Sequence, residues 1–292
     1  MNPLYITDLD GTLLTDHGTL SPVTFNILQN LLEKGILFTT ASARSVASIQ
    51  HIFKGLKLDL PVIEFNGAII SDLQSGQHLF INSIDPPLVE DICSVIEEHG
   101  CSPFVSTYTG VEDRLYYSSI ANEGVKWYLN DRRIQNDKRL RFVEKISSSF
   151  SDQVICLNVI GKLEVLTDLE CELRERYRGS LEIHCLEDHY SPGFFWLTAH
   201  DRKATKDNAI KELQQITGLS GNEVVVFGDN ANDTGMFKIA DRSIAVSNAI
   251  DELKQCATKI IRSNNENSVA EFIQSDFEKS LKLKRHDSVG NQ

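Results

Sequence analysis

The sequence has few positive charges and no apolar run long enough to span a bilayer. Its 29 lysines and arginines stand against 41 aspartates and glutamates, which gives a formal net charge of −12. This balance disfavours a nucleic-acid backbone or an anionic membrane surface as a partner, and we expect neither. An anionic small substrate would need a metal ion or a local positive charge at its binding site.

Cysteine is also sparse, because the 292-residue chain has only six, with no Cys-x-x-Cys pair and no dense framework. Such scattered cysteines are typical of free thiols in a reducing compartment. The N-terminus lacks a basic segment followed by an apolar one, and Asp8 comes too early for a signal peptide. We therefore expect a soluble cytoplasmic protein, and the 41% hydrophobic content is ample for a folded core.

The most informative stretch is an apolar, β-prone run at 4–7 followed by Asp8-Leu9-Asp10-Gly11-Thr12. Alternate residues of an extended chain project to the same side, so Asp8 and Asp10 can converge. Gly11 permits a tight turn whose backbone N–H groups face an anion. Two such carboxylates indicate Mg²⁺ held beside a phosphate, or a nucleophile with a general acid/base, or both. An acidic turn that only ends a strand is the structural alternative.

Strands and helices alternate after this motif. The predicted elements are a helix at 20–34 and strands at 36–40 and 61–65. Short strands separated by helices predict a parallel sheet with right-handed crossovers, in which ligands gather at the carboxyl ends of the strands. Asp8, Ser42 and Asn66 all fall at such ends.

The alternation breaks at about residue 83, where helices mix with paired β-like runs. We predict that 83–199 form a separate α+β unit inserted into the first pattern. That pattern resumes at Lys206, and a buried strand at 223–227 ends in Gly228-Asp229-Asn230-Ala231-Asn232-Asp233. The polar end of the chain, 278–292, is expected to be frayed.

These strand ends and the lysine occur in the order of a known family. The chain resembles the haloacid dehalogenase superfamily, and within it the Cof-like sugar-phosphatase branch. Four motifs carry the resemblance: Asp8-Leu9-Asp10-Gly11-Thr12, the strand end at Ser42, Thr205-Lys206-Asp207-Asn208-Ala209, and Gly228-Asp229-Asn230-Ala231-Asn232-Asp233. Asn66-Gly67-Ala68 and Ser247-Asn248-Ala249 fit secondary positions of the branch. Any one motif is only suggestive, whereas the ordered set is highly specific.

The resemblance implies an α/β fold with two parts. A Rossmann-like core with a three-layer parallel sheet would comprise residues 1–82 and 200–292. Residues 83–199 would form an inserted α+β cap that closes over the site, excludes water and selects the leaving group. In that cap, Asp188-His189-Tyr190-Ser191-Pro192-Gly193 is a candidate loop facing the substrate, although an ordinary Pro-Gly hairpin is the preferred interpretation.

The resemblance also implies a role for each motif residue. Asp8 would attack phosphorus and become an aspartyl-phosphate, while Asp10 would protonate the leaving alkoxide and later deprotonate water. Ser42 and Lys206 would hold the phosphoryl oxygens. The Mg²⁺ site would use the Asp8 carboxylate, the Asp10 carbonyl and Asp229, supported by Asp233. Substrate contacts would come from Gly11, Ala43, Arg44, Asn66 and Asn232.

Local reasoning leaves alternatives open at four of these positions. Ser42 could be a helix N-cap, alone or together with a phosphate-binding role at that helix N-terminus. Lys206 could be a solvated residue at a helix start, where a cation is mildly unfavourable. Ala43 replaces the glycine usual in this branch and adds a methyl group near the phosphate. Arg44 could orient substrate or form a surface ion pair.

We therefore expect a Mg²⁺-dependent phosphatase that hydrolyses a small phosphorylated metabolite, with a sugar phosphate monoester as the favoured substrate class. The protein would be a monomer or a homodimer. A phosphomutase of the same superfamily is one alternative, and a non-catalytic relative that binds phosphometabolites is another. Release of inorganic phosphate separates hydrolysis from transfer.

Overall fold

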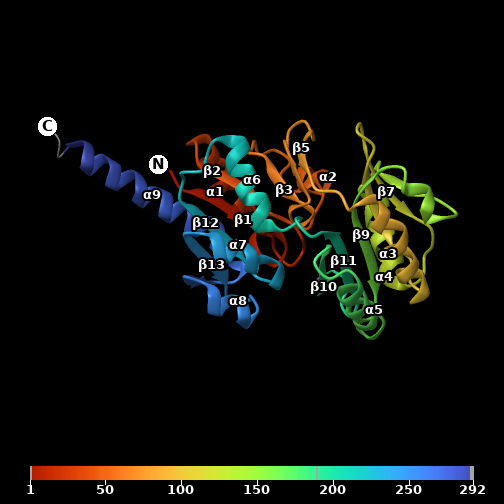
Figure 1. Ribbon diagram of the computed structural model, residues 1–292. Helices are drawn as coiled ribbons and strands as arrows, with labels where there is room; N and C mark the ends of the chain where they lie inside the picture. Colours follow the sequence, from red (N-terminus) through yellow and green to blue (C-terminus); the bar gives the residue numbers. More distant parts are fainter. Residues whose placement is uncertain (1, 189, 290–292) are drawn as a thin grey trace. The chain divides into compact units, whose positions relative to one another are not determined.

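The chain divides into two compact units, one formed by residues 1–79 and 206–292 and the other by residues 80–205. This computed structural model describes residues 2–188 and 190–289 (Figure 1). The first unit is built from both ends of the chain, seen as the red and blue segments in Figure 1. The inserted unit is somewhat longer than the stretch 83–199 expected from the sequence.

The first unit contains a five-stranded parallel sheet, as predicted, in the order β14-β13-β12-β1-β2. Its strands are β1 (Leu4–Thr7), β2 (Leu37–Thr40), β12 (Val224–Gly228), β13 (Arg242–Val246) and β14 (Lys259–Ile261). Its helices are α1 (Pro22–Glu33), α2 (Val46–Ile52), α6 (Lys206–Thr217), α7 (Thr234–Ile239), α8 (Asp251–Cys256) and α9 (Ser268–Val289). The central strand β1 pairs with β12 on one side and β2 on the other.

Both faces of this sheet are buried, which explains why its strands are apolar throughout. On one face, Tyr5 donates a hydrogen bond of 2.7 Å to Asp276 of α9, and Phe227 packs edge-on against Phe272 of the same helix. Leu4 and Ile6 alternate with Tyr5, so they point to the opposite face, where they are also fully buried. The layered α/β core expected from the sequence is thereby confirmed.

The strand predicted at 61–65 differs from expectation. Its ordered part, β3 (Val62–Glu64), makes one parallel bridge, between Ala41 and Ile63, beyond the end of β2. It pairs instead in a small separate sheet with β4 (Ile69–Ser71) and β5 (His78–Ile81). The reason is local, because the chain turns sharply directly after Glu64 and returns antiparallel.

The second unit is a six-stranded sheet with helices on both faces. The strand order is β10-β11-β9-β6-β7-β8. The strands are β6 (Phe104–Tyr108), β7 (Asp113–Tyr117), β8 (Leu140–Phe142), β9 (Gln153–Gly161), β10 (Leu181–Glu187) and β11 (Phe195–Asp201). Residues of α3 (Pro86–Glu98) and α5 (Leu163–Arg176) share one apolar cluster, and residues of α4 (Glu123–Ile134) belong to a second.

The C-terminal segment 278–292 was expected to be frayed, but α9 continues as a helix to Val289. Residues 290–292 lie outside the described part of the chain. Polar composition suggested coil, whereas lysine, leucine, glutamate and arginine are all good helix formers. Among the described residues, no helix combines the length and apolar character needed to cross a membrane.

Helix α6 offers a matched test of the core. Ile210 is fully buried, whereas Ile216 on the same helix is 42% exposed. We expect Ile210→Ala to lower the free energy of unfolding by about 2–5 kcal/mol, because it leaves a cavity. Ile216→Ala should change it by less than about 1 kcal/mol. Urea denaturation measures both, and equal losses would contradict the packing described.

Candidate active site

The carboxyl ends of β1, β2 and β12 bring three of the four motifs to one edge of the sheet. The Asp8 N–H donates to the carbonyl of Phe227 at 2.9 Å, and the Ala41 N–H donates to the carbonyl of Thr7 at 2.9 Å. The residues that follow these strands therefore lie side by side. The fourth motif, at Lys206, reaches the same edge through its side chain.

Lys206 is the centre of this arrangement. Its Nζ donates to Asp8 Oδ1 at 2.6 Å and to Asp233 Oδ1 at 2.7 Å, and the lysine side chain is completely buried. Burial by itself would lower the pKa of Lys206, but the charges and hydrogen bonds of Asp233 and Asp8 raise it above its ordinary value. The lysine therefore stays protonated, and the solvated-residue interpretation is wrong.

Three buried carboxylates surround this ammonium group. Asp8, Asp229 and Asp233 each place one oxygen within 4.8 Å of the others. Burial raises the pKa of Asp8 to about 7, with Lys206 opposing the rise and Asp233 adding to it. Burial and the Asp8 charge likewise hold the pKa of Asp229 well above its usual range. One lysine does not neutralise this group, and oxygen ligands of this kind fit a hard divalent cation such as Mg²⁺.

The hydrogen bonds separate the three carboxylates by role. Asp233 Oδ1 accepts from Lys206, and its Oδ2 accepts from the N–H groups of Asp229 and Asn230 at 2.9 and 3.1 Å. Asp229 Oδ1 accepts from Thr12 Oγ1 at 2.8 Å. Both oxygens of Asp233 are thus engaged, which suits support of a metal site more than direct ligation.

The Asp10 carboxylate contacts Arg44. Arg44 donates to it through Nε at 2.7 Å and Nη2 at 2.6 Å, a two-bond ion pair, and its Nη1 donates to Ser48 at 3.2 Å. Arg44 was expected to contact substrate or form a surface ion pair. It forms an ion pair, but the partner is the predicted acid/base residue, and both side chains are partly buried.

Ser42 is buried but does not cap a helix, so that interpretation is wrong. Its Oγ accepts the N–H of Arg44 at 3.2 Å, and α2 begins later, with Ser45 at the N-cap position. The first N–H of that helix, at Val46, donates to the buried carboxylate of Glu64. That end of α2 is therefore already occupied by an acidic side chain. Ser42 has only its hydroxyl group and backbone to offer a phosphate.

Glu64 was missed by sequence reasoning. Its carboxylate also accepts from Ser71 Oγ and lies 3.5 Å from His78 Nδ1, and both the glutamate and histidine side chains are buried. A charged residue inside an otherwise apolar predicted strand was the available signal, since such groups are buried only when paired. The role of Thr12, the last residue of the first motif, was missed as well.

The backbone requires a glycine at position 11 but not at position 43. Gly11 has a φ of +74°, and a Cβ there would lie 2.4 Å from Asp229 Oδ2. Its carbonyl accepts from Asn248 Nδ2 at 2.7 Å. Ala43 is exposed and is not among the residues with positive φ, so its backbone does not require the usual glycine.

Asn66 and Asn232, two predicted substrate contacts, form a hydrogen bond of 3.0 Å with each other.

The order of these motifs matches a known family over most of the chain. The family model for haloacid dehalogenase-like hydrolases matches residues 5–273. The chain belongs to this family.

Relatives of this hydrolase span nearly its whole length. The 5-amino-6-(5-phospho-D-ribitylamino)uracil phosphatase YwtE of Bacillus subtilis is 27% identical over 280 residues, covering 91% of this chain and 95% of YwtE. The pyridoxal phosphate phosphatase YbhA of Escherichia coli is 26% identical over 274 residues, covering 92% and 96%. The crystal structure of TM0651 from Thermotoga maritima matches with a TM-score of 0.75 at 25% identity, covering 94% and 97%. This hydrolase is a haloacid dehalogenase-family phosphatase, which confirms the predicted family.

In the second unit of the hydrolase, the loop at 188–193 connects the antiparallel strands β10 and β11. Asp188 Oδ1 accepts the N–H of Tyr190 at 3.0 Å, and the Tyr190 ring stacks on Trp127 at 6.4 Å. His189 of this candidate loop lies outside the described residues. The connection is a hairpin, as the ordinary interpretation predicts.

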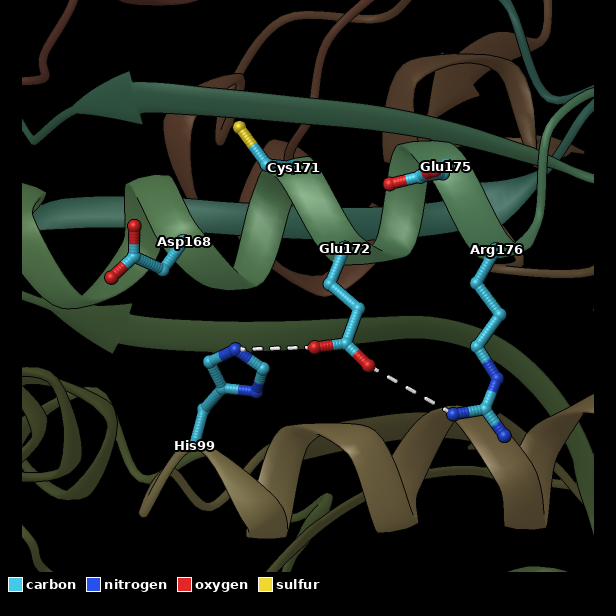
Figure 2. Close-up of a pocket in the computed structure, with 6 residues that line it drawn as sticks. All are labelled: His99, Asp168, Cys171, Glu172, Glu175 and Arg176. Carbon is cyan, nitrogen blue, oxygen red and sulfur yellow. Dashed lines mark ion pairs between the residues drawn. The ribbon is translucent and has the colours of Figure 1, made fainter.

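A pocket of about 590 Å³ in the second unit does not suit a phosphate ester (Figure 2). Glu172 lies between His99 and Arg176, at 3.5 and 3.9 Å, and Arg176 also pairs with Asp91 at 2.7 Å. Arg176 is thus committed to carboxylates. Carboxylates make up half of the lining, which comes from the end of α3 and one side of α5: His99, Asp168, Cys171, Glu172, Glu175 and Arg176.

The crowding at Gly11 yields a prediction. Gly11→Ala should lower the free energy of unfolding by about 1–3 kcal/mol, because the new methyl group displaces Asp229, and it should abolish any rise in melting temperature that Mg²⁺ gives in the wild type. Gly35→Ala is the control, since φ there is +76° but no heavy atom lies within 4 Å of the added carbon. Thermal denaturation with and without Mg²⁺ measures both. A wild-type response in Gly11→Ala would contradict the site geometry.

Proposed function

We propose that the protein is a Mg²⁺-dependent phosphatase that hydrolyses a small phosphate monoester through an aspartyl-phosphate on Asp8. The observation that carries this proposal is the buried cluster in which Lys206 joins Asp8 to Asp233 while Asp229 lies beside them. It combines a carboxylate nucleophile, a fixed cation and surplus oxygen ligands in one place.

The donor set fits a magnesium ion. Asp8 and Asp229 would hold it together with the backbone carbonyl of Asp10, and Asp233 would orient the loop. When bound, Mg²⁺ would supply positive charge that neutralises the carboxylates and the phosphoryl oxygens. The geometry supports this assignment, because oxygens of three buried carboxylates lie within 4.8 Å of one another beside a single lysine.

The first half-reaction would form a bond between an Asp8 carboxylate oxygen and phosphorus and break the bond from phosphorus to the ester oxygen. Asp10 would donate a proton to the departing alkoxide. Lys206 and the Ser42 hydroxyl would stabilise the charge on the phosphoryl oxygens during transfer. Lys206 can do so without moving, because Asp8 and Asp233 already fix its ammonium group.

In the second half-reaction, water would attack phosphorus, the bond from phosphorus to Asp8 would break, and Asp10 would accept the proton of the water. The ion pair with Arg44 suits both steps, since its two N–H donors fix the orientation of the Asp10 carboxyl group. Inorganic phosphate and free Asp8 would result. Arg44 would thus serve the reaction through Asp10.

The relatives support the substrate class. The two named enzymes, YwtE and YbhA, are phosphatases of a phosphoribitylamino-uracil and of pyridoxal phosphate. Both names describe small phosphorylated metabolites, and we propose the same class here, with sugar phosphates as the favoured members. We also propose that the inserted unit acts as the cap and selects the leaving group, because the first unit already supplies the groups for phosphoryl transfer.

Asp8→Asn tests the nucleophile. We expect phosphate release from a panel of phosphometabolites to fall at least about a thousandfold, because the amide cannot form the acyl-phosphate. The fold should persist, since asparagine keeps an acceptor for Lys206. Asp59→Asn, at an exposed carboxylate, is the control. Wild-type activity should vanish with chelator and return with Mg²⁺, and near-normal turnover by Asp8→Asn would refute the proposal.

Asp10→Asn tests the acid/base role. For alkyl phosphates we expect kcat to fall about 10²- to 10⁴-fold, because the poor leaving group needs a proton. For aryl phosphates, whose leaving groups depart unprotonated, the first half-reaction should suffer much less. The burst of aryl alcohol in rapid-mixing experiments measures this step. Equal losses with both kinds of ester would contradict the acid role.

A further inference from the structure

The chain turns after β3 through three consecutive residues in the left-handed region. Phe65, Asn66 and Gly67 have φ values of +49°, +55° and +108°. Glycine adopts this conformation freely and asparagine tolerates it, but phenylalanine does so only under constraint from its surroundings. This turn is therefore held in place by specific contacts.

Two backbone hydrogen bonds join the turn to the loop that carries Ser42 and Arg44. The N–H of Phe65 donates to the carbonyl of Arg44 at 3.1 Å, and the N–H of Asn66 donates to the carbonyl of Ser42 at 2.9 Å. The Asn66 residue is 2% exposed. The turn and the Ser42–Arg44 loop consequently form one rigid piece.

The Asn66 side chain then reaches a different motif. Its Oδ1 accepts a hydrogen bond of 3.0 Å from Nδ2 of Asn232. Asn232 lies in the short turn Ala231–Asp233, next to the residue that holds Lys206 and close to Asp229. One pair of side-chain amides thus connects the loop of the phosphoryl-binding serine to the loop of the metal-binding carboxylates.

We infer that Asn66 and Asn232 are positioning residues whose mutual hydrogen bond locks these two loops into one geometry. The inference rests on the proposed function and concerns how its site is assembled. Both asparagines were expected to contact substrate, but one side-chain polar atom of each is engaged by the other, and the Asn66 N–H donates to Ser42. The bond pre-organises the Asp229–Asp233 loop before any substrate arrives.

Magnesium binding to the substrate-free protein distinguishes the two roles. A residue that only contacts substrate does not change this affinity, whereas loss of the bond lets the Asp229–Asp233 loop move. Asn66→Gly keeps the left-handed backbone and removes the amide. By calorimetry we expect its dissociation constant for Mg²⁺ to rise about three- to tenfold, the effect of one hydrogen bond. Asn232→Ala should give the same loss from the other loop.

Asn136→Gly is the matched control, because Asn136 has the same φ of +55° but lies exposed in the second unit. It should bind Mg²⁺ like the wild type. Each single change already breaks the hydrogen bond between the two asparagines. The dissociation constant for Mg²⁺ of the double variant Asn66→Gly/Asn232→Ala should therefore exceed the larger of the two single-variant values by no more than about twofold. Melting temperatures confirm that all variants are folded at the assay temperature.

Three results would overturn the inference. If Asn232→Ala bound Mg²⁺ as tightly as the wild type, the positioning role of the Asn66–Asn232 hydrogen bond would be refuted. The proposed function would still stand, provided that the wild-type protein releases phosphate. Multiplying losses in the double variant would show two independent roles. Failure of the wild type itself to bind Mg²⁺ and release phosphate would refute the proposed function, and the inference with it.

Discussion

The buried ammonium group of Lys206 is the interaction on which the rest of the site depends. A lysine with no exposed side-chain surface is stable only when paired, because transferring an isolated charge out of water costs several kcal/mol or more. Asp8 and Asp233 meet that need, and in doing so they fix three segments of the chain at one point: the end of β1, the start of α6 and the turn after β12. Removing either acid would leave the buried ammonium group with only one carboxylate partner.

The same arrangement creates a deficit of positive charge. Lys206 satisfies one oxygen of Asp8 and one of Asp233, but Asp229 adds a third buried carboxylate. The chain as a whole is acidic, with a formal net charge of −12, so long-range electrostatics do not attract a phosphate ester. Local charge has to do so. In the proposed mechanism a divalent cation between Asp8 and Asp229, together with Lys206, would meet this requirement and would make the acidic composition compatible with an anionic substrate.

Much of this site could be predicted from sequence because its parts are local. Three of the four motifs follow a strand whose apolar run is visible, and the ends of parallel strands meet at one edge by geometry alone. That reasoning places Asp8 and Asp229 together without knowledge of side-chain contacts. The burial of Lys206 was harder to predict from the sequence, since a lysine in the first turn of a helix is ordinarily exposed.

The contacts that sequence could not give are those between distant residues. The Arg44 pair with Asp10, the Asn66 bond to Asn232 and the burial of Glu64 all depend on which side chains meet after folding. Local propensity also failed at β3, where a short strand left the parallel sheet, and at α9, where polar residues continued a helix. At β3 a sharp turn directly after the strand, and at α9 a helix-forming composition, outweighed the expected pattern.

The pairing of β1 with β12 has a consequence for synthesis on the ribosome. Leu4 pairs with Leu37 on one side and with Val224 on the other, so the central strand of the first unit waits for more than two hundred residues before its second neighbour emerges. The second unit is one continuous stretch, 80–205, that has left the exit tunnel by then and can fold first, as domains do during translation. Nascent chains stalled after residue 205 has left the tunnel but before β12 has emerged should therefore carry a folded insertion and an N-terminal segment that is still a client for chaperones.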